Sequence, residues 1–155
     1  MKIRLLCIAT LATALALPLT AQAQGTAPIR VGAVLSTTGP VGFIGDPQLK
    51  VLELYVKRIN EQGGLLGRKV ELITYDDQSD PTNANTFTKR LIDSDKVDVL
   101  VGGTVTPSAM AMAAQAERAG VPYVSTGGGV ALVEPVKKWV FKTQPTDRLV
   151  ALRIL

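Results

Sequence analysis

The sequence of 155 residues has no histidine and one cysteine, Cys7. Histidine is the side chain that most often moves protons near neutral pH, so the usual activator of a nucleophile is missing. A single cysteine cannot form a disulfide within the chain. Ser125 does not lie in the G-x-S-x-G turn of serine hydrolases. Aromatic residues make up 5% of the chain and basic residues are scattered, so a nucleic-acid surface is not indicated either.

The N-terminus has the features of a secretory signal peptide. Lys2 and Arg4 precede an apolar run over residues 5–17, which is shorter than the roughly 20 residues that span a bilayer. Residues 21–23, Ala-Gln-Ala, form a small-residue cleavage signature. We therefore expect residues 1–23, and with them the one cysteine, to be removed on export to the periplasm. A membrane anchor or a helix of the fold is the alternative interpretation.

Short apolar segments alternate with helical patterns along the rest of the chain. Residues 29–35 and 97–101 are apolar and rich in β-branched side chains, which is typical of parallel strands covered on both faces. A loop dense in glycine and proline follows at 36–46, and apolar residues recur at helical spacing over 47–62. The alternation predicts an α/β fold with a doubly wound, mostly parallel sheet. The further elements expected are strands at 70–75 and 140–143, a helix capped by Asp80, a helix over 107–119, and a final helix capped by Thr146 or Asp147.

Residues 97–129 suggest where a ligand binds. Thr106 is placed to cap a helix after the strand, Pro107 fits the first helical position, and Gly120 is suited to end it. Backbone N–H groups at a helix start attract anions, carboxylates included. Ligands of open α/β sheets lie beyond the carboxyl ends of the strands. The pattern therefore predicts a corner that receives an anionic group, with no catalytic residues beside it.

Three blocks of sequence carry a family resemblance. They read IRVGAVLSTTGPVGFIGD, then RINEQGGLLGRKVELITYDDQSDPTNA, then VDVLVGGTVTPSAMA followed by GVPYVSTGGG. Together, in this order and spacing, they resemble the leucine/isoleucine/valine-binding family of periplasmic receptors, the type I solute-binding proteins of ABC importers. The similarity covers residues 28–155.

The resemblance implies a particular domain organisation. Members of this family have two α/β lobes joined by crossing strands, with the ligand in the cleft between the lobes. On this basis residues 24–143 are expected to form an incomplete N-terminal lobe, with residues 139–143 as the first crossing strand. Residues 144–155 would begin the second lobe, and the sequence would be an N-terminal fragment of a longer protein.

The resemblance also implies which residues meet the ligand. The family holds the ligand carboxylate at the start of the helix after the third strand, where Thr106 and Ser108 would supply N–H and hydroxyl donors. Ordinary capping of that helix is the alternative. In the turn after the fourth strand, Gly127 would offer its carbonyl to an ammonium group. Gly129 occupies the family's hydroxyl position, and a glycine has no side-chain donor there. The alternative is that these glycines only allow a tight turn.

Two further sets of residues have both a binding and a structural interpretation. Phe43 and Ile44 lie where the family places an aromatic residue against the ligand, and they could instead be packed loop residues. Asp76, Asp77 and Asp80 could suggest a metal site or paired catalytic carboxylates. Adjacent residues on a strand point apart, and Asp80 is explained as a helix cap, so a structural role is favoured and no metal or cofactor is expected.

The expected function is therefore that of a non-enzymatic periplasmic receptor. It would deliver a branched-chain or related amino acid to the permease subunits of an ABC transporter in the inner membrane. A receptor for an aromatic or other organic acid is the alternative that Gly129 and Ile44 motivate. The ligand-sensing module of a receptor or regulator would share the fold. A dinucleotide-dependent enzyme is disfavoured because residues 39–45 read G-x-x-G-x-x-G and not G-x-G-x-x-G.

Overall fold

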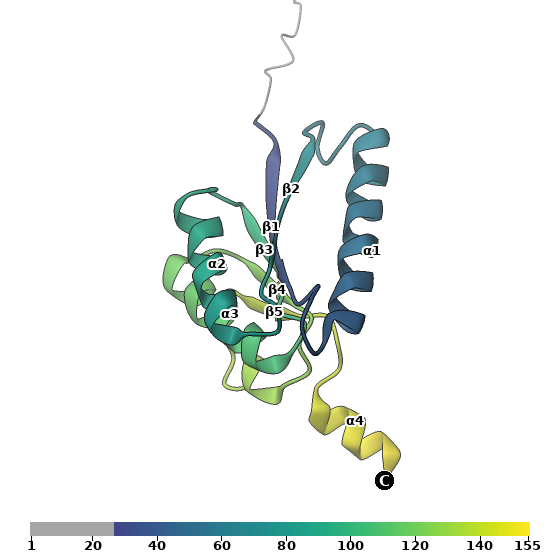
Figure 1. The fold of residues 1–155 in the computed structure, drawn as a ribbon, viewed down its shortest axis with the longest axis vertical. Coiled ribbons are helices and arrows are strands. Elements are labelled where there is room, and N and C mark those ends of the chain that lie inside the picture. Colours follow the sequence, from purple (N-terminus) through teal and green to yellow (C-terminus); the bar gives the residue numbers. More distant parts are fainter. Residues whose placement is uncertain (1–26) are drawn as a thin grey trace, which may run out of the picture.

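The computed structural model describes residues 27–155, so the predicted signal peptide lies outside the described residues. Five parallel strands form one sheet in the order β2-β1-β3-β4-β5 (Figure 1). This order confirms the prediction of a doubly wound α/β fold, because the chain starts in the middle and winds outward on both sides. The strands are β1 (Ile29–Leu35), β2 (Val70–Asp76), β3 (Val99–Gly102), β4 (Tyr123–Ser125) and β5 (Val140–Lys142).

Helices cover the two faces of this sheet unequally. On one face, α2 (Pro81–Asp93) and α3 (Thr106–Ala119) pack against each other and over the central strands. On the other face, α1 (Gly42–Glu61) contacts only β1 and β2 closely (Figure 1). A short 3-10 turn, η1 (Val130–Leu132), and a terminal helix, α4 (Asp147–Ile154), complete the fold.

The hydrophobic core lies between the sheet and the α2–α3 pair. Leu100 of β3 and Tyr123 of β4 are fully buried there, beneath Leu91 of α2 and Met112 of α3. Ala84 and Leu91 of α2 are fully buried, and Phe87 stacks on Tyr75 with ring centroids 5.0 Å apart. Burial of these side chains supplies most of the driving force for this half of the fold.

Helix α1 begins earlier than the sequence predicted. The loop expected over residues 36–46 is only partly correct, because the helix starts at Gly42 and includes Pro47. Gly45 explains the early start: a Cβ at this position would lie 2.0 Å from the carbonyl oxygen of Ser36. The missing side chain lets the first turn of the helix pack against the end of β1.

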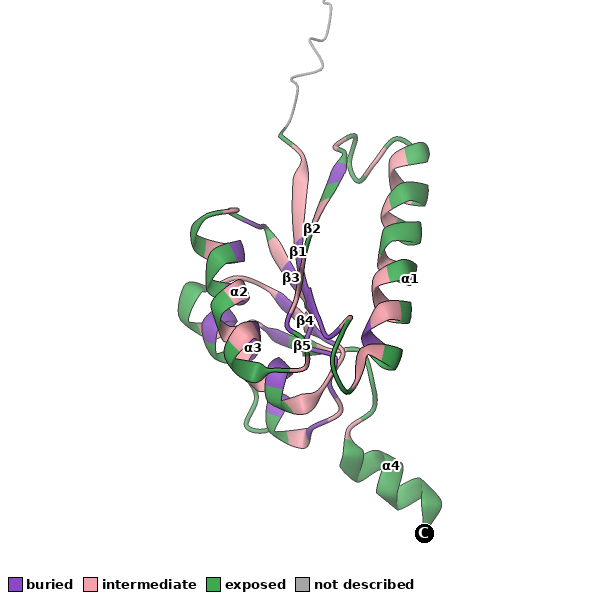
Figure 2. Cartoon of the chain, viewed as in Figure 1, coloured by how far each residue is buried: buried purple, intermediate pink, exposed green. Residues whose placement is uncertain are grey.

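The face of the sheet beyond α1 is largely uncovered. Tyr55 of α1 is 56% exposed and Phe141 of β5 is 55% exposed, whereas Val140, which points to the opposite face, is buried. Figure 2 shows the exposed outer side of α1 and the wholly exposed α4, which projects from the body of the molecule. Helix α4 has no buried residue, so it is positioned by its attachment to the preceding chain and by surface contacts, among them the Arg148–Glu134 ion pair at 3.1 Å.

Among the described residues, no helix combines the length and apolar character needed to cross a membrane.

Candidate functional site

Helix α3 starts at the carboxyl edge of the sheet, directly after β3. Its first intrahelical bond runs from the Ala109 N–H to the Val105 carbonyl at 2.9 Å. The N–H groups of Thr106 and Ser108 therefore precede the helical ladder and lie at the positive end of the helix dipole. The predicted cap is wrong: the N-cap residue is Val105, which makes no side-chain cap bond, and Thr106 is the first helical residue.

The Thr106 side chain instead joins the helix to the turn after β4. Its Oγ1 accepts a hydrogen bond of 3.1 Å from the N–H of Gly129. A Cβ at Gly129 would lie 2.4 Å from the Thr106 Cγ2 methyl carbon, so the threonine methyl fills the space that a side chain at position 129 would need. The structure thus brings together two of the predicted site residues that are 23 positions apart.

The turn of residues 126–129, named the ligand turn after its predicted role, is held by the strand ends. The Thr126 N–H donates to the Gly102 carbonyl at 2.9 Å. The Gly127 N–H donates to Ser125 Oγ at 3.1 Å. Gly127 also packs on the first turn of α3, where a Cβ would lie 2.8 Å from that of Ala109. The ligand turn and the start of α3 therefore form one rigid corner.

The remaining predicted site residues lie apart from the Thr106–Gly129 contact. Ser108 is fully buried, and among the described residues its hydroxyl has no hydrogen-bond partner. Phe43 and Ile44 lie in the first turn of α1, on the opposite face of the sheet from α3. Phe43 is 76% exposed and Ile44 is 38% exposed, so neither is packed as a core residue.

Asp76 fastens the loop that precedes α1 to the end of β2. Its Oδ1 accepts the N–H groups of Thr37, Thr38 and Gln78 at 3.0, 3.2 and 2.9 Å. Its Oδ2 accepts the Thr38 hydroxyl. Partial burial alone would raise the pKa of Asp76, but the hydrogen bonds from Thr38, Gln78 and Thr37 outweigh it and hold the pKa below its usual value.

Replacing Asp76 with asparagine is expected to lower the free energy of unfolding at pH 7 by roughly 1.5–3 kcal/mol, the usual range for hydrogen bonds to a charged group. Because folding lowers this pKa, the stabilisation is present above the unfolded value of 3.8 and is lost as the pH falls through the folded value. Urea titrations of both proteins between pH 7 and pH 3 should therefore show their difference shrinking in acid.

Glu71→Gln is the control for this measurement. Glu71 lies on the same strand and pairs with Arg30 at 3.1 Å, but its side chain is 45% exposed. Exposed pairs contribute at most about 1 kcal/mol. If the two variants lost equal amounts of unfolding free energy at pH 7, the role assigned to Asp76 would be contradicted.

The other two acidic residues of this motif have structural roles, as the sequence indicated. Asp80 is the N-cap of α2, and its Oδ1 accepts the Thr82 N–H at 2.6 Å. Asp77 is fully buried and accepts the Ser79 N–H at 2.9 Å. Within residues 27–155, no three His, Cys, Asp or Glu side chains gather as metal ligands would.

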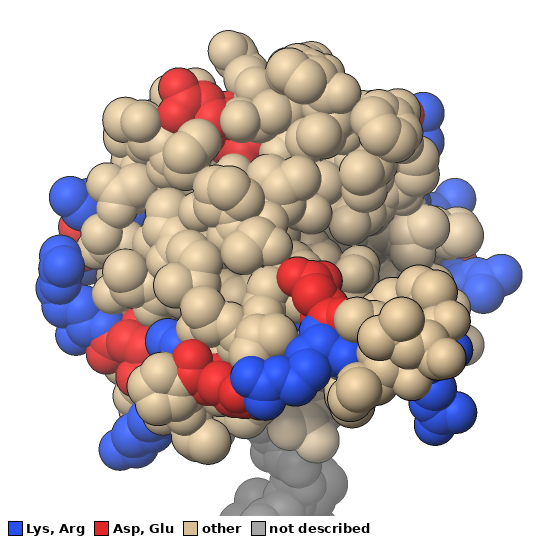
Figure 3. Space-filling view, turned by 90° about the horizontal axis from the view of Figure 1, so that it is seen from below, with Lys and Arg blue, Asp and Glu red and all other residues tan. Residues whose placement is uncertain are grey.

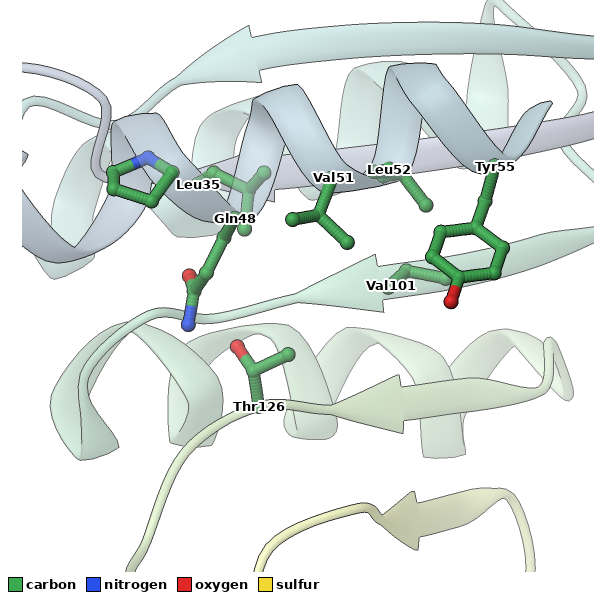
Figure 4. A pocket seen from close by; sticks show the side chains of 8 residues that line it. Leu35, Gln48, Val51, Leu52, Tyr55, Val101 and Thr126 are labelled. Carbon is green, nitrogen blue, oxygen red and sulfur yellow. The ribbon is translucent and has the colours of Figure 1, made fainter. Parts of the chain in front are cut away.

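A separate groove of about 430 Å³ lies between α1 and the uncovered sheet face. Figure 4 shows its apolar wall and, at one end, the amide of Gln48 and the hydroxyl of Thr126. The Gln48 Oε1 accepts from the Thr104 hydroxyl at 2.9 Å, which joins α1 to the loop after β3. Of the predicted site residues, none lines this groove. We regard it as part of the uncovered sheet face and not as the predicted ligand corner.

The carboxyl edge is largely uncharged at its surface. Figure 3 views the molecule from this end and shows most Lys, Arg, Asp and Glu toward the edges, with a mixed group of acidic and basic side chains reaching toward the middle. The start of α3 offers N–H donors, the Thr106 hydroxyl and the positive end of the helix dipole, while the charged side chains of Lys142 and Asp147 lie against Gly128 of the adjacent turn.

Two polar residues near the ligand turn were missed by the sequence analysis. Lys142, at the end of β5, donates from Nζ to the Gly128 carbonyl at 2.7 Å. The N–H of Asp147 donates to the same carbonyl at 3.2 Å. Neither contact has a local sequence signal, because both depend on how β5 pairs with β4.

Comparison with known proteins agrees with this architecture. The family model of the periplasmic binding protein matches residues 28–154. The chain belongs to this family. Leu/Ile/Val-binding protein homolog 7 of Brucella abortus (strain 2308) is 33% identical over 105 residues, covering 68% of this chain and 26% of the relative. The sequence thus spans about a quarter of that relative's length.

Solved structures of family members have the same fold. LivJ of Streptococcus pneumoniae, a branched-chain amino acid transporter substrate-binding protein solved with isoleucine, aligns with a TM-score of 0.74 at 27% identity, covering 77% of this chain and 34% of LivJ. A solute-binding protein of Rhodopseudomonas palustris BisB5, solved with 3,4-dihydroxybenzoic acid, aligns with a TM-score of 0.69 at 29% identity, covering 77% of this chain and 32% of its own. The family is periplasmic, and its members are ABC-transporter substrate-binding proteins and not enzymes.

Proposed function

We propose that this chain is the N-terminal part of a periplasmic receptor that delivers a small carboxylate-bearing ligand to an ABC permease. In this proposal residues 1–23 direct export, residues 24–143 form an incomplete first lobe, and residues 144–155 begin a second. The ligand, a branched-chain or related amino acid, lies in a cleft between the lobes. The observation that carries the proposal is the corner formed by the start of α3 and the ligand turn, joined through Thr106 and Gly129.

The corner suits a carboxylate for physical reasons. The N–H groups of Thr106 and Ser108 lie at the positive end of α3. The Thr106 hydroxyl accepts from Gly129 and retains its own proton to donate. The Gly127 carbonyl, in the adjacent turn, is the acceptor proposed for an ammonium group. Closure of the second lobe over this corner would exclude water and strengthen each of these hydrogen bonds.

An aromatic or other organic acid is the second candidate ligand. Gly129 lacks the hydroxyl that the family resemblance assigns to recognition of an amino acid, and the Thr106 methyl fills that space. The relative from Rhodopseudomonas palustris BisB5, solved with 3,4-dihydroxybenzoic acid, is 29% identical. Loss of one neutral hydrogen bond changes affinity by about 1 kcal/mol, which is enough to shift a preference between ligand classes.

Isothermal titration calorimetry on the complete gene product, refolded to remove carried-over ligand, tests the proposal. Leucine, isoleucine, valine, benzoate and 3,4-dihydroxybenzoate are the ligands. 3-Methylbutylamine and benzamide, which lack a carboxylate, are the matched controls. We expect saturable binding of at least one carboxylate and none of the controls. Tighter binding of the benzoates than of leucine would select the second candidate. Absence of binding by all five carboxylates would overturn the proposal.

A further inference from the structure

We propose that Lys142 is a positioning residue that fastens the connector between β5 and α4 to the ligand turn. The connector comprises residues 143–146. The proposal rests on the proposed function only in treating residues 126–129 as part of the ligand site. The placement of Lys142 itself follows from hydrogen bonds between residues that the structure describes.

The Lys142 ammonium group is surrounded by backbone carbonyls from both segments. Its Nζ donates to Gly128 of the ligand turn at 2.7 Å, to Pro145 at 2.8 Å and to Gln144 at 3.2 Å. An ammonium group has three hydrogens, so these three acceptors use its full donor capacity. The side chain is partly buried, which strengthens hydrogen bonds to a charged donor relative to those made in water.

Other contacts attach the connector to the end of β4 and the start of α4 to the ligand turn. The Thr143 N–H and hydroxyl both donate to the Ser125 carbonyl, at 3.1 and 3.2 Å. The Asp147 N–H donates to Gly128. A Cβ at Gly128 would lie 2.5 Å from the Asp147 Oδ1, so the start of α4 is closely packed on the turn.

This arrangement couples the direction of α4 to the shape of the ligand turn. Helix α4 buries no residue of its own, and Figure 1 shows it projecting from the body of the molecule at the end of the connector. Gly128 lies beside Gly129, whose N–H is bound to Thr106 at the start of α3. A continuous set of hydrogen bonds therefore runs to α3 through the ligand turn, from the connector through Lys142 and from α4 through the Asp147 N–H.

Lys137 provides a matched control. Its Nζ also donates to three backbone carbonyls, those of Ala131, Leu132 and Pro135, at 2.6, 3.2 and 3.5 Å. These acceptors lie in and after η1, not in the ligand turn or the connector. Lys137→Met thus removes an ammonium group with three hydrogen bonds to carbonyls, and it leaves the hydrogen bonds between the connector and the ligand turn in place.

Spin labels on α1 and α4 measure the attachment directly. Lys57→Cys and Arg153→Cys are introduced into a Cys7→Ser background, and pulsed electron paramagnetic resonance gives the distribution of distances between them. We expect one narrow distribution in the parent and in Lys137→Met, and a width at least about twice as large in Lys142→Met. Lys142→Arg keeps the charge and the donors and should remain narrow. A parent-like distribution in folded Lys142→Met would overturn the proposal.

Two additions keep the test decisive. Circular dichroism shows whether each variant is folded. If Lys142→Met does not fold, the neutral, polar variant Lys142→Gln takes its place, and the width of its distance distribution is judged in the same way. In the complete receptor, Lys142→Met should weaken ligand binding by at least about tenfold and Lys137→Met by less than twofold. Equal weakening in both variants would count against the positioning role. A parent receptor that binds no carboxylate would overturn the proposed function, while the label distances would still decide the role of Lys142.

Discussion

Gly102→Ala is expected to prevent the chain from folding. Gly102 ends β3 with φ of +121° and pairs with Val34 of β1 on one side and Ser125 of β4 on the other. L-residues rarely adopt this φ. A Cβ at this position would also lie 2.1 Å from the Val34 carbonyl oxygen. Relief requires β1 and β3 to separate at the centre of the sheet.

Separation would break several contacts at once. The Gly103 N–H donates to the Val34 carbonyl, and the Gly102 carbonyl accepts from both the Thr126 N–H and the buried Tyr123 hydroxyl. We expect Gly102→Ala to lower the free energy of unfolding by more than about 4 kcal/mol, which is among the largest effects of point mutations. Domains are stable by only about 5–15 kcal/mol, so urea unfolding followed by circular dichroism should show little or no folded protein.

Gly67→Ala separates the two causes of this effect. Gly67 has φ of +74°, yet a Cβ there would meet no atom within 4 Å. Alanine at this position meets only the left-handed backbone penalty, about 1–2 kcal/mol. If Gly102→Ala were no more destabilising than Gly67→Ala, the close approach of β1 and β3 would not be the constraint described here.

Elements defined by local signals were predicted well from the sequence. The first strand, Ile29–Leu35, has the predicted bounds because its apolar run is flanked by turn residues. Gly120 ends α3 in the left-handed conformation, and Thr146 caps α4 by accepting the Leu149 N–H. These features depend on residues within a few positions of one another, which is the range over which propensity and capping act.

Features set by distant residues were predicted less well. Helix α1 begins at Gly42 because Gly45 can approach the Ser36 carbonyl, and this contact joins two elements. Thr106 was expected to cap α3, but its side chain accepts from Gly129, 23 residues away. A threonine at a helix start satisfies the local capping pattern whether or not a distant donor uses its oxygen.

The candidate site shows the same division. The sequence located the start of α3 and the turn after β4, because both follow apolar strands. From the sequence, Gly129 was interpreted as the absence of a hydroxyl or as a glycine that allows a tight turn. The structure supplies a reason for the glycine, namely the Thr106 methyl beside it. The side chains at positions 106 and 129 therefore compete for the same space, so a larger residue fits at one position only if the residue at the other is smaller.

This shared space predicts strong coupling between two substitutions in the complete receptor. Gly129→Thr alone would place Cβ 2.4 Å from the Thr106 Cγ2 methyl. The ligand turn would have to move, so we expect ligand affinity to fall at least tenfold, about 1.4 kcal/mol. Thr106→Ser alone keeps the hydroxyl and removes the methyl, and should change affinity by less than threefold.

Thr106→Ser combined with Gly129→Thr should recover binding. Without the methyl, the next atoms near the new Cβ would be the hydroxyl oxygen at 3.1 Å and Cβ of residue 106 at 3.4 Å, which small shifts can accommodate. The new hydroxyl at position 129 would also offer an α-amino acid one more hydrogen bond, so leucine should gain relative to benzoate. Calorimetry on the four proteins gives the coupling free energy, which we expect to exceed about 1 kcal/mol. Additive effects of the two substitutions would mean that Thr106 and Gly129 do not share the space that the structure gives them.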